Sequence, residues 1–186
     1  MIDFLNINFS RSFHLFFLRI GFNKNNYQNF KDLNFKQNDF INYKIIKHYV
    51  VKDNFIKNVN ILDAHMFNFL FFYQKLGGKK GIELSKKNIF LWFKKFKYYT
   101  KFPWNTDHAS KRLINLIYSY DFICSISRKK EIEQINKILN FHIKRITFDV
   151  GLKKINNISS SEILALVLIM CCKNSLNSKI IKKIDN

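Results

Sequence analysis

The sequence predicts an all-α protein built of consecutive antiparallel helices. From residue 61 onward, apolar residues recur at helical spacing, and helix-ending residues separate these segments. No stretch shows the alternation of a half-buried strand. The length of 186 residues and the 47% content of hydrophobic residues suffice for one core. We therefore expect one helical domain over 61–186, preceded by a poorly defined segment, 1–60, of short helices and loops.

The first two predicted helices of this domain follow residue 61. The first is apolar on most sides, which indicates burial, and Gly77-Gly78 is expected to end it because glycine readily adopts the left-handed conformation. Ser85 is predicted to cap the second helix. The stripe of the first helix is Leu62, His65, Met66, Phe69, Leu70 and Tyr73, and that of the second is Ile89, Trp92, Phe93 and Phe96.

A rigid turn separates these helices from the rest. Pro103 fixes its own φ and biases Phe102 towards an extended conformation, so the preceding helix should stop before it. Thr106 or Asp107 can then cap a third helix by accepting from its free N–H groups. Its apolar positions are Leu113, Ile114, Leu116, Ile117, Tyr120 and Ile123.

Three further helices are expected towards the C-terminus. One spans 128–146 and a short basic one lies near 178–184. Between them, Ser159-Ser-Ser-Glu162 is a capping box in front of the run 163–170. That run is apolar almost all round, which is typical of a helix covered on several sides. We therefore expect the chain to be one piece of a larger helical assembly.

The net charge of +19 indicates nucleic acid, an anionic membrane surface or an acidic polymer as a partner. Nucleic acid is not the first choice, because binding sites that need bidentate contacts favour arginine over lysine. The abundance of Lys, Asn, Ile and Phe also indicates an AT-rich genome, so we attribute much of the charge to compositional drift. The arginines are Arg11, Arg19, Arg112, Arg128 and Arg145, against 32 basic residues in all.

Several classes of site are not expected. Cys124, Cys171 and Cys172 are odd in number and show no ligand spacing, so neither a disulfide framework nor a metal site is implied. No glycine-rich phosphate loop is present, and no cofactor is expected. The apolar run 13–20 is too short to span a bilayer and lacks the features of a signal peptide. A cytoplasmic location is the default expectation, and a periplasmic one stays open.

Three segments, taken in order, resemble the N-terminal helical domain of heparinase II/III-like polysaccharide lyases over roughly 61–172. They are the run 62–70, the run 102–115 with its Trp-x5-Ser-x-Arg pattern, and the residues in front of Ala165-Leu166. The positions that match the family's motifs are His65 in the first segment, Trp104, Ser110, Arg112 and Asn115 in the second, and Asn157 in the third.

The resemblance implies part of an incomplete α/α toroid and a role in β-elimination at a uronic acid of an acidic polysaccharide. It implies that Asn157 is catalytic, donating to the substrate carboxylate while a base removes the neighbouring proton. It implies substrate binding by Trp104, Arg112 and His65, and we expect Trp104, Arg112 and Asn157 to line one hollow. Each residue also has a structural interpretation: Trp104 as a core anchor, Arg112 as an exposed or paired cation, His65 as a packed ring, and Asn157 as a loop residue.

The chain also departs from the family pattern. Ile158 stands where the family has a histidine and cannot accept a proton, and Asn156 replaces a glycine. The family's tyrosine and β-sandwich domain lie further downstream than this chain extends. We therefore expect a domain that is incomplete as an enzyme by itself, with a second chain as a possible source of the β-sandwich. The alternatives are a basic helical nucleic-acid-binding module or a fragmentary protein without activity.

Overall fold

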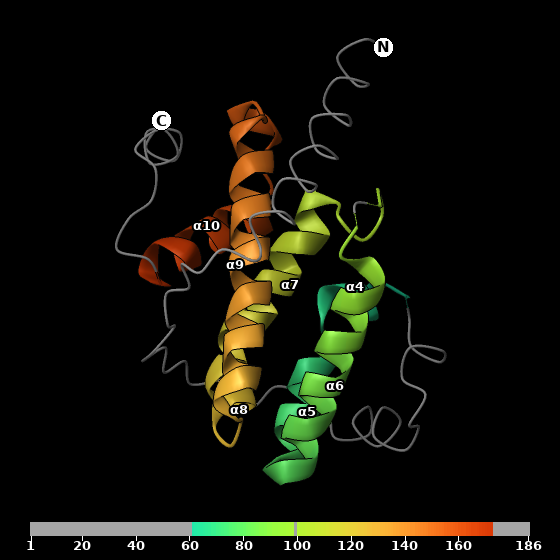
Figure 1. Cartoon of the computed structure of the whole chain (residues 1–186). Coiled ribbons are helices and arrows are strands. Elements are labelled where there is room, and N and C mark those ends of the chain that lie inside the picture. Colours follow the sequence, from blue (N-terminus) through green and yellow to red (C-terminus); the bar gives the residue numbers. More distant parts are fainter. Residues whose placement is uncertain (1–60, 99, 173–186) are drawn as a thin grey trace.

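The computed structural model describes residues 61–98 and 100–172, and within these ranges the protein is helical and contains no strand (Figure 1). The predicted all-α class is thus confirmed. The segment 1–60 and the short helix expected near 178–184 lie outside the described residues. Among the described helices, none combines the length and the apolar character needed to cross a bilayer.

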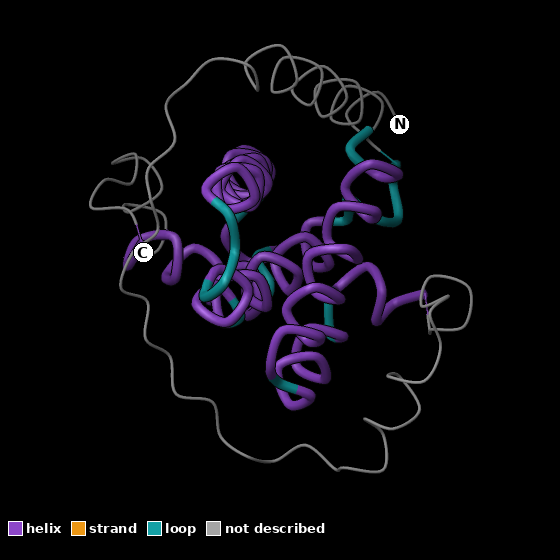
Figure 2. The backbone as a smooth tube through the Cα atoms, turned by 60° about the horizontal axis from the view of Figure 1, so that its bottom comes forward, coloured by secondary structure: helices purple, strands orange, loops and turns teal. Residues whose placement is uncertain are grey.

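Helix α7 occupies the centre of the arrangement. It packs against α4, α9 and α10, while α6 packs against α5 and α8 (Figure 1). The core therefore forms around the apolar residues of α7, including Leu113, Leu116 and Ile117. Figure 2 shows the described helices in purple, joined by loops and turns in teal. The elements are α4 (Ile61–Met66), α5 (Phe69–Leu76), α6 (Gly78–Phe96), α7 (Thr106–Tyr118), α8 (Tyr120–Cys124), α9 (Lys129–Gly151), the 3-10 helix η1 (Ile155–Asn157) and α10 (Ser160–Cys172).

The first predicted helix is broken into α4 and α5. Phe67 lies between them with a φ of 62°, a left-handed conformation that is costly for a residue with a side chain. Its ring is fully buried and packs against Phe69 and Trp92, with centroid distances of 5.2 Å in both cases. Burial of this large ring offsets the backbone strain. The prediction of one continuous stripe was therefore wrong at this point.

The end of α5 was predicted correctly, but the start of α6 was not. Gly77 has a φ of 68° and its N–H donates to the Tyr73 carbonyl at 3.1 Å, which ends α5. α6 begins directly afterwards at Gly78, so Ser85 lies inside the helix. The Ser85 hydroxyl donates to the Gly81 carbonyl at 2.8 Å, and this bond within the helix replaces the predicted capping role.

The turn before α7 is fixed at both ends. Asn105 caps the helix, because its Oδ1 accepts from the Asp107 N–H at 3.0 Å; the cap lies one residue before Thr106. Trp104 ties the turn to the end of α6, since its Nε1 donates to the Phe96 carbonyl at 2.6 Å. The chain therefore enters α7 in a defined direction.

The last two described helices follow the predictions closely. α9 begins where expected and continues to Gly151, five residues further than the periodicity indicated. The predicted capping box of α10 is confirmed: the Ser159 N–H donates to Glu162 Oε2 at 2.9 Å, and the Glu162 N–H donates to Ser159 Oγ at 3.4 Å.

The close approach of α5 and α6 yields a stability prediction at Gly81. A Cβ at this position would lie 2.3 Å from the Tyr73 carbonyl oxygen and 3.1 Å from the Phe122 ring. Although alanine favours helices, Gly81→Ala should lower the free energy of unfolding by about 1–3 kcal/mol, as overpacking does. Gly151→Ala is the matched control, because nothing lies near its Cβ, and it should be neutral or stabilise by up to about 1 kcal/mol. Urea denaturation of both variants measures this, and equal effects would contradict the described helix contact.

Candidate functional site

The side chain of Arg112, on α7, joins three separate parts of the chain. Its Nε donates to His142 Nε2 on α9 at 2.8 Å. Its Nη1 donates to the His65 carbonyl of α4 at 2.5 Å and to the Pro103 carbonyl in the turn at 3.1 Å. Arg112 is fully buried, so these bonds form without competition from water. The guanidinium thereby holds α4, α9 and the turn against α7.

Aromatic rings surround the same guanidinium. Its central carbon lies 4.0 Å from the ring centroid of Trp92, 4.9 Å from that of Trp104 and 5.7 Å from that of Phe67. Burial lowers the pKa of Arg112 well below its usual value, but arginine stays protonated in proteins. In the described part of the chain no carboxylate pairs with Arg112, and its Nη2 has no hydrogen-bond partner. Ring faces and carbonyl dipoles stabilise this buried cation.

The break between α4 and α5 supplies the acceptors for α7. Helix ends leave carbonyl groups without partners inside the helix and carry partial negative charge. Arg112 donates to the carbonyl of His65, and Asn115 Nδ2 donates to the carbonyl of Met66 at 2.9 Å and to Asn68 Oδ1 at 3.0 Å. Arg112 and Asn115 are three residues apart, so they lie on one face of α7. Together they cap the C-terminal end of α4.

Two buried histidines accept hydrogen bonds within this cluster. His142 Nδ1 lies 2.8 Å from the Ile138 carbonyl and must donate to it, which leaves Nε2 to accept from Arg112. His65 Nδ1 accepts from Trp92 Nε1 at 3.0 Å. Desolvation and then the charge of Arg112 lower the pKa of His65 to about 4 and that of His142 well below its usual value. Both rings are therefore neutral at pH 7.

Three of the four predicted site residues meet in this cluster, but in its interior. Trp104 is 1% exposed, Arg112 0% and His65 6%, so a polymer in solvent cannot touch them. Asn157, the last residue of η1, is exposed on the surface instead. The open hollow expected from Trp104, Arg112 and Asn157 is thus corrected to an enclosed core cluster with Asn157 outside it. The physical reason is that these side chains find their hydrogen-bond partners inside the core: Trp104 at the Phe96 carbonyl, Arg112 at two carbonyls and His142, and His65 at Trp92.

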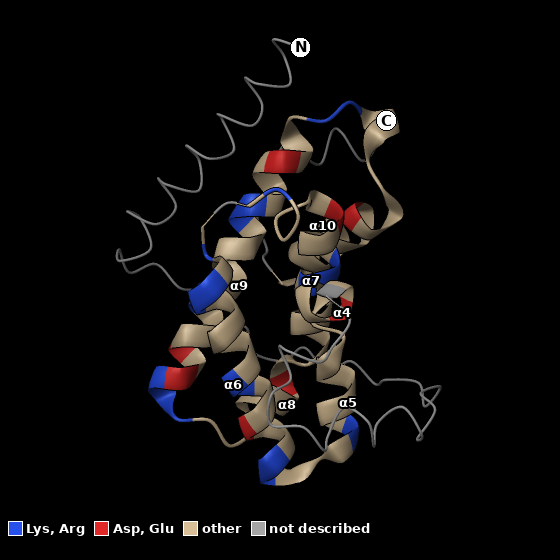
Figure 3. Cartoon of the chain, turned by 90° about the vertical axis from the view of Figure 1, so that its right-hand side faces the viewer, with Lys and Arg blue, Asp and Glu red and all other residues tan. Residues whose placement is uncertain are grey.

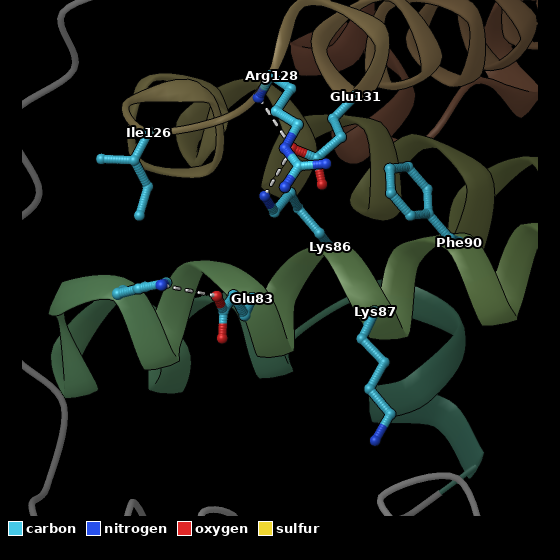
Figure 4. A pocket seen from close by; sticks show the side chains of 8 residues that line it. Glu83, Lys86, Lys87, Phe90, Ile126, Arg128 and Glu131 are labelled. Carbon is cyan, nitrogen blue, oxygen red and sulfur yellow. Dashed lines mark hydrogen bonds and ion pairs between the residues drawn. The ribbon is translucent and has the colours of Figure 1, made fainter.

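An open cleft lies elsewhere, between α6 and the start of α9 (Figure 4). Its volume is about 570 Å³. No local pattern in the sequence indicates this cleft, because its walls come from segments far apart in the chain. The residues that line it are Lys79, Glu83, Lys86, Lys87, Phe90, Ile126, Arg128 and Glu131.

The two carboxylates of the cleft, Glu83 and Glu131, are paired with lysines of the same cleft. Lys86, itself buried, pairs with Glu131 at 3.0 Å, and Glu131 also accepts from the Arg128 backbone N–H at 2.8 Å. Both contacts lower the pKa of Glu131 below its usual value. The hydrogen bond from the Arg128 N–H has the larger effect, and the contact with Lys86 has the next largest. In the described residues neither Lys87 nor Arg128 forms a close ion pair, although the charge of Arg128 also contributes to the lowered pKa of Glu131. The cleft therefore presents excess positive charge to solvent.

A row of lysines runs along α6 beside the cleft. Lys80, Lys87 and Lys94 are all exposed and follow one another every seven residues. Seven residues correspond to two helical turns, or about 10.5 Å, so these side chains share one face. This regular spacing is the signal in the sequence that could have indicated the basic surface.

The described residues contain no group of three or more His, Cys, Asp or Glu side chains placed to hold a metal ion. Comparison with models of known families, with curated proteins and with solved structures yields no match. The assignment of a function therefore depends on the geometry of the chain itself.

The buried Arg112 yields a stability prediction. Arg112→Met keeps the length of the side chain but leaves the His65 carbonyl and His142 Nε2 without donors. Because each buried polar group left unpaired costs about 1–3 kcal/mol, the free energy of unfolding should fall by about 3 kcal/mol. Arg128→Met, at an exposed arginine, should change it by less than about 0.5 kcal/mol. Urea denaturation distinguishes the two, and a neutral Arg112→Met would contradict the role given to Arg112.

The neutral histidines yield a pH prediction. The unfolded chain protonates its histidines near pH 6.5. In the folded chain the pKa of His65 is lowered to about 4, and burial lowers that of His142 well below its usual value. Stability is therefore full above pH 6.5 and is lost as the pH falls, by about 1.4 kcal/mol per histidine at about pH 5.5. Urea denaturation at these pH values measures the loss. His142→Gln should remove about half of it, and an unchanged pH dependence in that variant would be inconsistent with a neutral His142.

Proposed function

We propose that this chain is a helical domain that binds an acidic polysaccharide, related to the N-terminal domain of heparinase II/III-like lyases, and that it is incomplete as an enzyme by itself. The observation that supports the binding role is the basic cleft between α6 and α9. Its residues differ from those that carry the resemblance, of which His65, Trp104 and Arg112 lie in the core and Asn157 lies on the surface.

The cleft combines the two features that an acidic sugar polymer requires. Lys87 and Arg128 offer cations that are not paired with carboxylates of the described chain, so they can meet carboxylate or sulfate groups. Figure 4 shows Phe90 and Ile126 on either side of Lys86, and Ile126 is well exposed. Such apolar side chains can pack against the C–H faces of sugar rings. Charge and apolar contact thus occur in one open site.

The lysine row fits a polymer better than a small anion. Lys80, Lys87 and Lys94 repeat about every 10.5 Å along α6. This is about the length of a disaccharide in an extended 1→4-linked chain. A polysaccharide with one acidic group in every second sugar would therefore meet one lysine per repeat.

Catalysis would need groups that the described residues do not bring together. β-Elimination requires a base for the proton next to the carboxylate and donors for the charge that develops there. Asn157 is exposed and could donate to a carboxylate, but its neighbour Ile158 has no titratable group. His65 and His142 are buried and engaged. In this proposal a second chain supplies the base.

A nucleic-acid-binding module is the alternative, because lysines attract phosphates as readily as carboxylates. The same measurement separates the two. Binding to heparin, polygalacturonate and duplex DNA should be compared at about physiological salt, with the polysaccharides bound more tightly than the DNA. Tighter binding of DNA would favour the alternative.

The cleft yields the variant test of this proposal. Lys87→Ala combined with Arg128→Ala should weaken polysaccharide binding about tenfold, which corresponds to about 1.4 kcal/mol. Lys144→Ala combined with Lys154→Ala removes the same charge at exposed positions outside the cleft and should change binding less than about twofold. Equal losses in both variants would show generic charge attraction and reject the cleft as the site. An absorbance assay can detect the unsaturated uronide product of a lyase. If the chain alone forms this product, the proposal that it is incomplete as an enzyme is wrong.

A further inference from the structure

One face of α10 is both apolar and open. Ile163, Leu164 and Val167 are 44%, 43% and 41% exposed, and their spacing places them on a single side of the helix. The opposite side is buried against the domain, with Ala165 and Ile169 fully enclosed. α10 packs mainly on α7 and more lightly on α9. The expectation that this helix is covered on several sides thus holds for one side only in the described structure.

The open face of α10 carries no charge. The only charged residue of the helix is Glu162, which is fully buried and ion-paired with Lys153. Figure 3 shows lysines and arginines on α6 and α9, whereas α10 has none. Charges beside its first turn are paired: Lys153 with Glu162, and Asp107, which accepts from Ser161, with Lys111. The exposed Lys154 precedes the helix in the chain. The surface is therefore an uncharged apolar strip on a chain of net charge +19.

The size of this strip argues against a second copy of the chain as the occupant. A helix of 13 residues is about 20 Å long and about 10 Å wide, so its open face covers about 200 Å². A stable protein interface buries about 800 Å² on each partner. Two copies would also bring two net charges of +19 together, which is unfavourable.

A lipid surface meets both properties of the strip. Peripheral membrane binding becomes stable when apolar insertion is combined with a basic patch that meets anionic headgroups. Ile163, Leu164 and Val167 can enter the boundary between headgroups and acyl chains without burying a charge. Lys154 and the positive charge of the chain as a whole complement anionic lipids. We propose that α10 docks on an anionic membrane surface through Ile163, Leu164 and Val167, with its axis parallel to the bilayer.

The test is vesicle sedimentation with the full chain. Vesicles of phosphatidylcholine with added phosphatidylserine should bind the protein, and vesicles of phosphatidylcholine alone should bind it much less. Leu164→Ser combined with Val167→Ser should weaken binding to the mixed vesicles at least tenfold. Leu91→Ser is the control, because Leu91 is 42% exposed but lies among the lysines of α6, and it should change binding less than twofold.

A second readout does not depend on the stability of the serine variant. In Leu164→Trp, the fluorescence emission of the introduced tryptophan should shift to the blue when mixed vesicles are added. In Leu91→Trp it should not. Absence of binding to the mixed vesicles, equal losses in the serine variant and its control, or no shift in Leu164→Trp would each overturn the proposal. So would a stable dimer in sedimentation velocity that the serine substitutions dissociate, since the strip would then be a protein interface.

Discussion

A buried cation without a carboxylate partner in the described chain organises this fold. Arg112 brings α7 into contact with α4, α9 and the turn at Pro103 through three hydrogen bonds, and the rings of Trp92 and Trp104 cover its faces. Lysine could not replace it, because a compact ammonium lacks the planar fork and hydrates more strongly. The His65 carbonyl can accept from Arg112 only because α4 ends there and leaves this carbonyl without a partner inside the helix. The helix break and the arginine therefore depend on each other.

The residues that hold the helices together around Arg112 are distinct from those of the cleft and of the exposed face of α10. Asn157 is exposed, but other residues that suggested a heparinase II/III-like domain engage their polar atoms within the core and at helix ends: His65, Trp104, Arg112 and Asn115. They account for how the helices pack. The cleft and the open face of α10 consist of other residues. Substitutions on these surfaces leave the contacts of the Arg112 cluster intact, because the two sets share no side chain.

The sequence predicted the helices well and their junctions less well. Periodicity identifies a helix because burial selects one face, and Gly77 marks an end because glycine adopts a positive φ. Phe67 gives no such signal, since only its buried ring and the donors of α7 make its left-handed backbone tolerable. The cleft was missed for a similar reason: Lys86 and Glu131 pair across 45 positions of the chain. Arg112 lies at a polar position of the periodic pattern, so local sequence cannot show that it is buried.

The most direct test of this account is the rate at which the Arg112 Nε–H exchanges with solvent, measured by ¹⁵N NMR at pH 7 with Arg128 as an internal reference. Arg112 is fully buried and bonded to His142, whereas Arg128 is exposed. The account predicts that the Arg112 proton exchanges at least about a hundredfold more slowly than that of Arg128, because exchange requires opening of the core. Equal exchange rates for the two arginines would contradict it.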